Sequence, residues 1–272
     1  MPVETQPKLE QITISPHIGS ELRVAKADLL SGELGPEIRG LLEQRGVILF
    51  RAIDLSDEEQ IEFTKTLGTM AQDIYKISMD PLENPNFAYT KGAFYWHIDG
   101  TMSDVPIFAS VMSCRRKSPV GGKTEFCNTY AAYDALPEDE KRQLEGIKAV
   151  HQFESAQRYV NPEPSYKELR GWQKFEPNVL PLVWTHRNGR KSLVLGATAS
   201  HVEGMELREG QLLLARLRDW ATQEQFTYSH EWTVGDMIMW DNTGTMHRVM
   251  AYPEDSGRLM HRTTVQGDEP FA

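Results

Sequence analysis

The chain has 272 residues and a net charge of −10, with 40% hydrophobic and 25% charged residues. This composition is typical of a soluble globular protein, and the excess of acidic residues argues against nucleic acid as the main partner. No apolar run approaches the roughly 18 residues of a membrane-spanning helix, so we expect no membrane insertion.

The amino-terminal part of the chain predicts helices around one short strand. Residues 1–7 lack the basic and apolar regions of a signal peptide. The predicted elements are a helix over residues 36–44, a strand over residues 47–50 and a helix over residues 60–67. Ser56 and Glu59 have the spacing of a capping box at the start of the second helix. Gly68 suits the position just after its end.

Beyond Asp99 the sequence becomes rich in short strands. The predicted strands cover residues 107–114, 123–127, 181–185, 191–195, 236–240, 246–251 and 261–266. Helical patterns cover residues 130–136, 137–144 and 205–225. Residues 155–180 contain three prolines and predict a long irregular stretch, of the kind that often forms an active-site lid. Short strands at close spacing are typical of a sandwich or barrel. We therefore expect an α+β protein with a mainly β core, a jelly roll (double-stranded β-helix) with flanking helices, in one domain over residues 1–272.

Two histidines and an aspartate suggest a metal centre. In a strand, residues i and i+2 point to the same side, so His97 and Asp99 can reach one metal together. His247 follows a predicted strand and a turn, which would place it near the mouth of a barrel. Two imidazoles and a carboxylate on one face of a metal are the ligand set of non-haem Fe(II) oxygenases. The same three ligands can also hold Zn(II).

A carboxylate receptor would fit beside this centre. Arg258 and Arg262 lie 11 and 15 residues after His247, and their even separation puts both on one face of a strand. An arginine can bind a carboxylate through two parallel charge-assisted bonds. With the hydroxyl of Thr124, this set could receive the far carboxylate of 2-oxoglutarate while the keto acid end chelates the metal.

Five ordered segments carry a family resemblance. They are Gly46–Arg51, Trp96-His97-x-Asp99, Pro119-x-Gly121-Gly122-x-Thr124, Gly235-Asp236-Met237-x-x-Trp240-Asp241-Asn242 followed by His247, and Arg258-x-Met260-His261-Arg262. In order and spacing the sequence resembles the TauD/TfdA family of Fe(II)/2-oxoglutarate-dependent dioxygenases over nearly its whole length. Some details are similar to the branch that oxidises 2,4-dichlorophenoxyacetate.

The resemblance implies a role for each matched residue. His97, Asp99 and His247 would bind Fe(II), in an enzyme that consumes 2-oxoglutarate and O2. Arg258 and Thr124 would hold the distal carboxylate of 2-oxoglutarate. Arg262 would meet an anionic group of the substrate and also touch the co-substrate, and Trp240 would line the floor of the site. Related halogenases lack the carboxylate at the position of Asp99, so its presence favours hydroxylation.

The substrate is expected to be a small anionic organic molecule that meets residues outside these motifs. The candidate contacts are Tyr75, Lys76, Phe153, Arg158 and Ala197, in addition to Arg262. Tyr75 and Lys76 lie where relatives place substrate contacts, Phe153 could form an apolar wall, and Arg158 could meet an anion. Ala197 is small where a bulky aromatic residue would narrow the pocket, which favours a larger substrate.

Two other functions are compatible with the sequence. The same cofactor chemistry could be diverted to desaturation or oxidative decarboxylation in secondary metabolism, as in isonitrile-forming enzymes. A Zn(II) jelly-roll hydrolase or binding protein could use the same three ligands, although it would not need Thr124 and Arg258. Cys114 and Cys127 are too few for a disulfide framework, which favours the cytoplasm. A homodimer or homotetramer is also expected.

Overall fold

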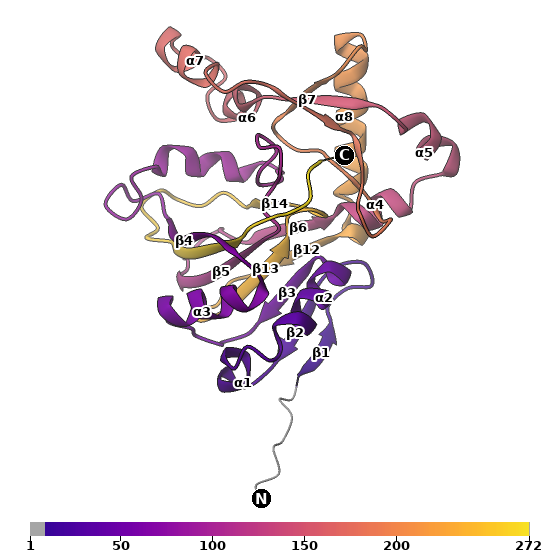
Figure 1. The fold of residues 1–272 in the computed structure, drawn as a ribbon. Helices are drawn as coiled ribbons and strands as arrows, with labels where there is room; N and C mark the ends of the chain where they lie inside the picture. Colours follow the sequence, from indigo (N-terminus) through magenta and orange to yellow (C-terminus); the bar gives the residue numbers. More distant parts are fainter. Residues whose placement is uncertain (1–8, 272) are drawn as a thin grey trace, which may run out of the picture.

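The computed structural model describes residues 9–271, and its core consists of two facing β-sheets (Figure 1). The predicted absence of a signal peptide at residues 1–7 lies outside the described residues. In spatial order, the large sheet contains β1 (Glu10–Thr13), β2 (Ser20–Arg23), β3 (Val47–Phe50), β13 (Met237–Asp241), β5 (Ala109–Arg116), β15 (Leu259–Val265) and β4 (Met70–Ile77). The small sheet contains β12 (Thr227–His230), β6 (Thr124–Asn128) and β14 (Thr245–Val249). Neighbouring strands are antiparallel except β2 and β3.

Alternation along the strands divides the apolar side chains between the two faces of the large sheet. On β3, Val47 and Leu49 belong to a cluster that includes Phe126 of the small sheet, so this cluster fills the space between the sheets. Ile48 and Phe50 belong to a second cluster, which packs against the helices on the outer face. Period-two alternation with both faces covered explains why all four residues of β3 are apolar and buried. The structure confirms the jelly-roll, mainly β prediction.

Three helices cover the outer face of the large sheet. They are α1 (Lys26–Leu30), α2 (Gly35–Arg45) and α3 (Asp57–Leu67), which lie with β1–β3 in the lower half of Figure 1. The predicted capping box is present, because Glu59 N–H donates to Ser56 Oγ (3.2 Å) and Ser56 N–H donates to Glu59 Oε2 (2.7 Å). Gly46 has φ +73° between α2 and β3, a conformation that favours glycine.

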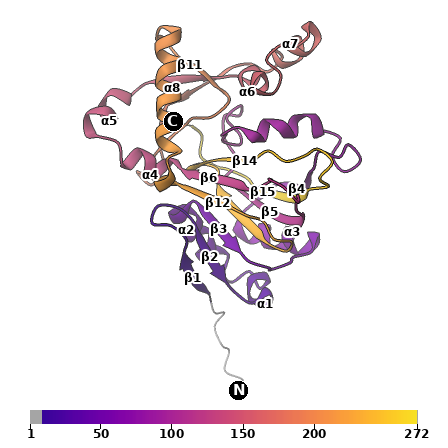
Figure 2. The ribbon, with the colours of Figure 1, turned by 180° about the vertical axis from the view of Figure 1, so that it is seen from behind.

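The upper half of the molecule carries a further set of elements around a third apolar cluster. They are α4 (Thr129–Asp134), α5 (Glu138–Leu144), β7 (Lys148–His151), β8 (Asn178–Pro181), β9 (Val183–Thr185), β10 (Lys191–Leu193), β11 (Ala199–Val202), α8 (Leu207–Ala221) and the 3-10 turn η2 (Glu224–Phe226). The strands form a three-stranded sheet, β11-β7-β8, and a hairpin of β9 and β10. Seen from behind, α8 stands upright beside β11 (Figure 2).

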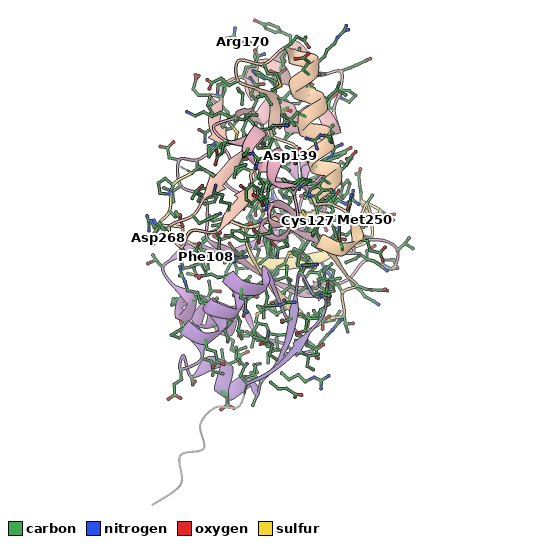
Figure 3. The ribbon with its side chains drawn as sticks, turned by 90° about the vertical axis from the view of Figure 1, so that its right-hand side faces the viewer. Phe108, Cys127, Asp139, Arg170, Met250 and Asp268 are labelled. Carbon is green, nitrogen blue, oxygen red and sulfur yellow. The ribbon has the colours of Figure 1, made fainter. Side chains whose placement is uncertain are left out.

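The prediction of an irregular stretch over residues 155–180 is wrong. This segment holds most of α6 (Phe153–Val160), the whole of α7 (Tyr166–Trp172) and the start of β8. Its prolines lie between these elements, and Ser165 starts α7 with a second capping box to Glu168. Figure 3 shows Arg170 of α7 at the upper extremity of the molecule. In the sequence alone, prolines that separate short helices could not be distinguished from the prolines of an unstructured loop.

Within residues 9–271, no helix combines the length and apolar character needed to cross a membrane. Cys114 and Cys127 are both buried and both free. Cys114 lies on β5 and Cys127 on β6, so the two thiols belong to different sheets.

Two buried histidines predict that the fold loses stability in acid. Burial lowers the pKa of His151 to about 4 and, with help from Arg190, that of His186 to about 4. The unfolded chain takes up these protons below about pH 6.5, whereas the folded chain resists until about pH 4. Stability is therefore fully present above pH 6.5 and declines as the pH falls toward 4. For His151 the loss is about 3 kcal/mol.

Urea unfolding at pH 7.5 and pH 4.5 measures this loss. His151→Asn should flatten the pH dependence relative to the wild type, because asparagine does not titrate. An unchanged pH dependence in the variant would contradict the assignment to His151.

Candidate active site and metal centre

A cavity of about 320 Å³ opens where the two sheets meet the upper elements. Its walls come from β4, the 3-10 helix η1 (Phe87–Phe94), residues 97–102, α6, residues 197–198 and β15. Most lining side chains are apolar or aromatic. His97, Asp99 and Arg262 are the charged or titratable groups at the inner end, apart from tyrosine hydroxyls. The cavity therefore combines an apolar enclosure with one polar end, as small-molecule sites usually do.

His97, Asp99 and His247 come together beside this cavity. Each offers one ligand atom, and these atoms all lie within 4.8 Å of one another. His97 and His247 exchange two backbone hydrogen bonds, of 3.1 and 2.9 Å, and their ring centroids are 4.1 Å apart. The prediction that His97 and Asp99 share a strand is wrong. His97 forms only an isolated β-bridge, and Asp99 lies in a turn that Gly100 permits with φ +94°.

The orientation of the three side chains fits a bound metal. The hydrogen bond from His97 Nδ1 to the carbonyl of Tyr95 (2.8 Å) leaves the Nε2 lone pair free. His97 Nε2 and His247 Nε2 lie 3.7 and 3.8 Å from oxygens of Asp99. Both distances are too long for hydrogen bonds. Two imidazoles and a carboxylate therefore converge on one point without bonding each other, which suits Fe(II).

The surroundings of this point keep Asp99 and His247 deprotonated. Burial opposes the charge of Asp99, but the guanidinium of Arg262 at 2.9 Å outweighs it together with His247 and His97, and the pKa falls to about 2. Burial, followed by the neighbouring His97, lowers the pKa of His247 well below its usual value. A metal needs anionic carboxylates and neutral imidazoles as ligands, and Asp99 and His247 have these forms at neutral pH.

A glycine behind His97 gives a direct test of this placement. A Cβ atom on Gly196 would lie 3.0 Å from His97 Cα and 3.1 Å from the carbonyl oxygen of Trp96, and Gly196 has φ +120°. We expect Gly196→Ala to cost about 1–2 kcal/mol of folding free energy through its backbone conformation. It should also shift His97 and weaken Fe(II) binding by about 10- to 100-fold.

Gly189→Ala is the matched control. Gly189 has φ +83° but no atom within 4 Å of the added Cβ, so only the conformational cost applies. Chemical unfolding and anaerobic Fe(II) titration of both variants separate the two effects. Equal Fe(II) affinity in the two variants would show that Gly196 does not position His97.

A second group of buried polar side chains fits a carboxylate. Arg258 is 3% exposed, its guanidinium lies 4.9 Å from the ring centroid of Tyr252, and no ion pair within residues 9–271 involves it. The hydroxyl of Tyr252 is buried without a hydrogen-bond partner. Gly122, with φ +75°, packs directly against the Arg258 side chain. Thr124, two residues later, accepts a 2.9 Å hydrogen bond from Trp232 Nε1. A buried cation without an acidic partner is costly, so this group suits an anionic ligand.

Arg262 and Trp240 each contact one member of the His97, Asp99 and His247 cluster. Arg262 on β15 is paired in register with Tyr75 on β4, and its guanidinium lies 5.6 Å from the centroid of the Tyr75 ring. The Trp240 ring is buried, 4.7 Å from the ring of His247, and its Nε1 donates to Asn242 Oδ1 (2.8 Å). Trp240 therefore supports His247 from inside the space between the sheets.

Comparison with known proteins agrees with this geometry. The family model described as "Taurine catabolism dioxygenase TauD, TfdA family" matches residues 10–264. The chain belongs to the TauD/TfdA family. A relative in Cupriavidus pinatubonensis, named alpha-ketoglutarate-dependent 2,4-dichlorophenoxyacetate dioxygenase, is 35% identical over 85% of this chain and 88% of its own. The (S)-phenoxypropionate/alpha-ketoglutarate-dioxygenase of Sphingobium herbicidovorans is 32% identical over 82% of each chain.

A solved structure extends the comparison to the fold. The crystal structure of AAD-2 in complex with Mn(II) and N-oxalylglycine has a TM-score of 0.85 and 30% identity, covering 97% of this chain and 100% of that one. This TauD/TfdA enzyme is accordingly an alpha-ketoglutarate-dependent (2-oxoglutarate-dependent) hydroxylating dioxygenase that uses Fe(II), 2-oxoglutarate and O2. The resemblance predicted from its motifs is confirmed, and a Zn(II) hydrolase is no longer a candidate.

The structure of the dioxygenase separates the predicted substrate contacts into two groups. Tyr75, Phe153 and Ala197 line the cavity with Arg262. Lys76 and Arg158 do not. Lys76 follows Tyr75 on β4, so it points to the other face of the strand, where it pairs with Glu83 at 2.9 Å. Arg158 is turned away from the cavity on α6 and pairs with Glu154 one turn earlier, at 2.8 Å. The prediction of these two as substrate contacts receives no support from their positions.

One row of hydrogen-bonded side chains in the cavity of the dioxygenase was not expected from any sequence pattern. Thr101 and Thr198 line the cavity, and their hydroxyls lie 2.9 Å apart. Behind them, His151 Nδ1 lies 2.8 Å from Thr198 Oγ1. His151 at the end of β7 pairs with Ala199 at the start of β11, which brings its side chain to the neighbouring Thr198. No spacing in the sequence distinguishes two such threonines from the others.

Proposed function

We propose that this dioxygenase hydroxylates a small organic acid that carries an aromatic group. The position of Arg262 is the observation that carries the proposal, because it is the one lysine or arginine among the described residues that line the cavity. Tyr75, Tyr89 and Phe153 give the same cavity aromatic walls. An anionic head group at Arg262 would leave the rest of such a substrate in apolar surroundings. A cavity with one basic end and aromatic walls matches an aryloxyalkanoate better than taurine, which has no aromatic part.

We propose the following roles for the residues of the centre. His97, Asp99 and His247 hold Fe(II), while Arg258 and Thr124 bind the distal carboxylate of 2-oxoglutarate. When bound, Fe(II) and 2-oxoglutarate activate O2, which yields succinate and CO2 and inserts one oxygen atom into a substrate C–H bond. The chain itself keeps Asp99 anionic through Arg262 and encloses the reacting groups away from bulk water. Trp240 supports His247.

The named substrates of two relatives, 2,4-dichlorophenoxyacetate and (S)-phenoxypropionate, support the same class. Hydroxylation of the carbon beside an ether oxygen gives a hemiacetal. With a phenoxyacetate, this product breaks down to a phenol and glyoxylate. The ether bond would thus be cleaved without a general base from the protein.

A substrate screen tests the proposal. Succinate formation should be measured with phenoxyacetates, alkylsulfonates, sulfate esters and N-acyl amino acids, with phenol release as a second readout. We expect the highest kcat/KM with a phenoxyalkanoate. A clear preference for an alkylsulfonate or a sulfate ester would overturn the aromatic-acid proposal.

Adjacent residues on β4 provide a matched pair of variants. Tyr75 faces Arg262 and the cavity, whereas Lys76 faces Glu83 outside it. With the best substrate, Tyr75→Ala should raise KM by about 10-fold through lost aromatic packing, and Lys76→Ala should leave KM unchanged. Equal effects of the two variants would show that Tyr75 does not contact substrate.

We also propose a setting for the enzyme. The free, buried cysteines Cys114 and Cys127 fit the reducing cytoplasm.

The chain would act as a single domain in a homodimer or homotetramer. Limited proteolysis can examine the single domain, and light scattering can examine the oligomeric state. Residues 155–180 would cover the cavity, since Ala156 and Gln157 of this segment line it. Their role as a lid can be followed by hydrogen exchange with and without substrate.

A further inference from the structure

One hydrogen bond at the carboxylate receptor has a fixed direction. Trp232 Nε1 lies 2.9 Å from Thr124 Oγ1, and this is the only side-chain hydrogen bond of Thr124 within the described residues. Both residues are almost fully buried, Thr124 at 2% and Trp232 at 4% exposure. His230 packs edge-on against the Trp232 indole, with ring centroids 4.6 Å apart, and helps to fix its orientation.

The chemistry of the two groups determines what Thr124 can offer to a ligand. An indole N–H can only donate, so the oxygen of Thr124 must accept. A hydroxyl has one proton and two lone pairs, and the indole occupies one lone pair. The proton of Thr124 is then left for a different acceptor. A carboxylate accepts only, and the hydrogen bond from a hydroxyl to it is charge-assisted.

We propose that Trp232 is a positioning residue for 2-oxoglutarate, which orients the Thr124 hydroxyl so that it donates its proton to the distal carboxylate. The inference rests on the proposed role of Thr124 and Arg258 as the carboxylate receptor. Trp232 does not touch the co-substrate in this proposal. It acts because hydrogen bonds in a chain strengthen one another in a buried site, and because the hydroxyl loses its freedom to turn away.

The alternative is that Trp232 only fills the space between the sheets, where it packs with Met112, Phe126 and Trp240. Trp232→Phe removes the N–H while keeping a ring in this space. Trp184→Phe is the matched control for a reduced ring. Trp184 is buried at 1% exposure in the upper cluster, and its Nε1 has no hydrogen-bond partner. A packing role predicts similar effects of the two variants on stability and no specific effect on co-substrate affinity.

A double-mutant cycle tests the proposal. The Kd of N-oxalylglycine is measured by calorimetry on the Mn(II)-loaded protein, and the Kd of 2-oxoglutarate by anaerobic titration of the Fe(II) protein, for Trp232→Phe, Thr124→Val and the double variant. We expect Trp232→Phe to raise both Kd values by about 3- to 10-fold and Thr124→Val by about 10-fold or more. The double variant should resemble Thr124→Val alone, because the indole has nothing left to orient.

The steady-state readout should follow the same pattern. Trp232→Phe should raise the KM for 2-oxoglutarate while leaving kcat at saturating 2-oxoglutarate and the KM for substrate close to wild type. Trp184→Phe should change none of these constants, even if both variants melt at a lower temperature.

Three results would contradict the proposed role of Trp232, and one of them would also contradict the role of Thr124. If Thr124→Val weakens binding but Trp232→Phe does not, the positioning role of Trp232 is wrong and the receptor stands. If the two effects multiply in the double variant, Trp232 acts independently of Thr124 and the proposal is again wrong. If Thr124→Val binds as tightly as the wild type, Thr124 is not part of the receptor, and both the proposed role and this inference fall.

Discussion

Asp99→Ala is expected to remove Fe(II) binding and to lower activity by roughly 1000-fold or more, because it deletes the only anionic ligand. In the wild type, the guanidinium of Arg262 lies 2.9 Å from the carboxylate of Asp99. Without that carboxylate, the guanidinium would add an uncompensated positive charge beside the two imidazoles. Anaerobic Fe(II) plus 2-oxoglutarate should give a weak visible charge-transfer band in the wild type. We expect no band in Asp99→Ala.

Asp57→Ala is the matched control for this substitution. Asp57, at the start of α3, also lies between an arginine and a histidine, with Arg115 and His261 each at 2.7 Å, but none of these three residues lines the cavity. It should keep the band and most of the activity despite some loss of stability. A wild type without the band, or an Asp99→Ala protein that retains it, would contradict the assignment of the metal centre.

Arg258→Met is expected to change stability and co-substrate affinity in opposite directions. Without ligand, Arg258 is a buried cation with no acidic partner in the described residues, and burial lowers its pKa. Methionine fills similar space without charge, so the apoprotein should melt at a higher temperature than the wild type. The Kd of 2-oxoglutarate should rise by about 100- to 1000-fold, since the carboxylate loses its buried cation.

The wild type should therefore melt below Arg258→Met without ligand and above it when ligand is bound. Saturating N-oxalylglycine with Mn(II) should raise the melting temperature of the wild type, whereas Arg258→Met should gain little. Arg115→Met is the control, because Arg115 has a carboxylate partner in Asp57 and its loss should destabilise the protein with or without ligand. An Arg258→Met apoprotein that melts below the wild type would show that the charge is already satisfied in the free protein.

Local patterns predicted the parts of the fold that depend on neighbouring residues. The capping box at Ser56 and the strand over residues 47–50 are present as expected, because capping and alternation act over a few residues. The cluster of His97, Asp99 and His247, which we propose as the metal ligands, was also expected from spacing, although the shared strand expected for His97 and Asp99 is absent. A turn at Gly100 brings the two side chains together, and strand alternation does not.

The side of an element that faces the cavity was not predictable from residue type. Lys76 and Arg158 are basic and close in sequence to cavity residues, yet each finds an acidic partner outside the cavity. The opposite holds for Thr198, which reaches the cavity only through the pairing of β11 with β7. Such contacts depend on tertiary pairing, to which a single sequence gives little access.

The two backbone hydrogen bonds between His97 and His247 have a consequence for iron binding while the enzyme is being synthesised. During synthesis, His97 and Asp99 leave the ribosome long before His247, which lies far downstream on β14. A nascent chain that ends before β14 holds only two of the three proposed ligands. With the proposed ligand set, we therefore expect tight Fe(II) binding only after β14 has been synthesised and has paired with the segment that carries His97.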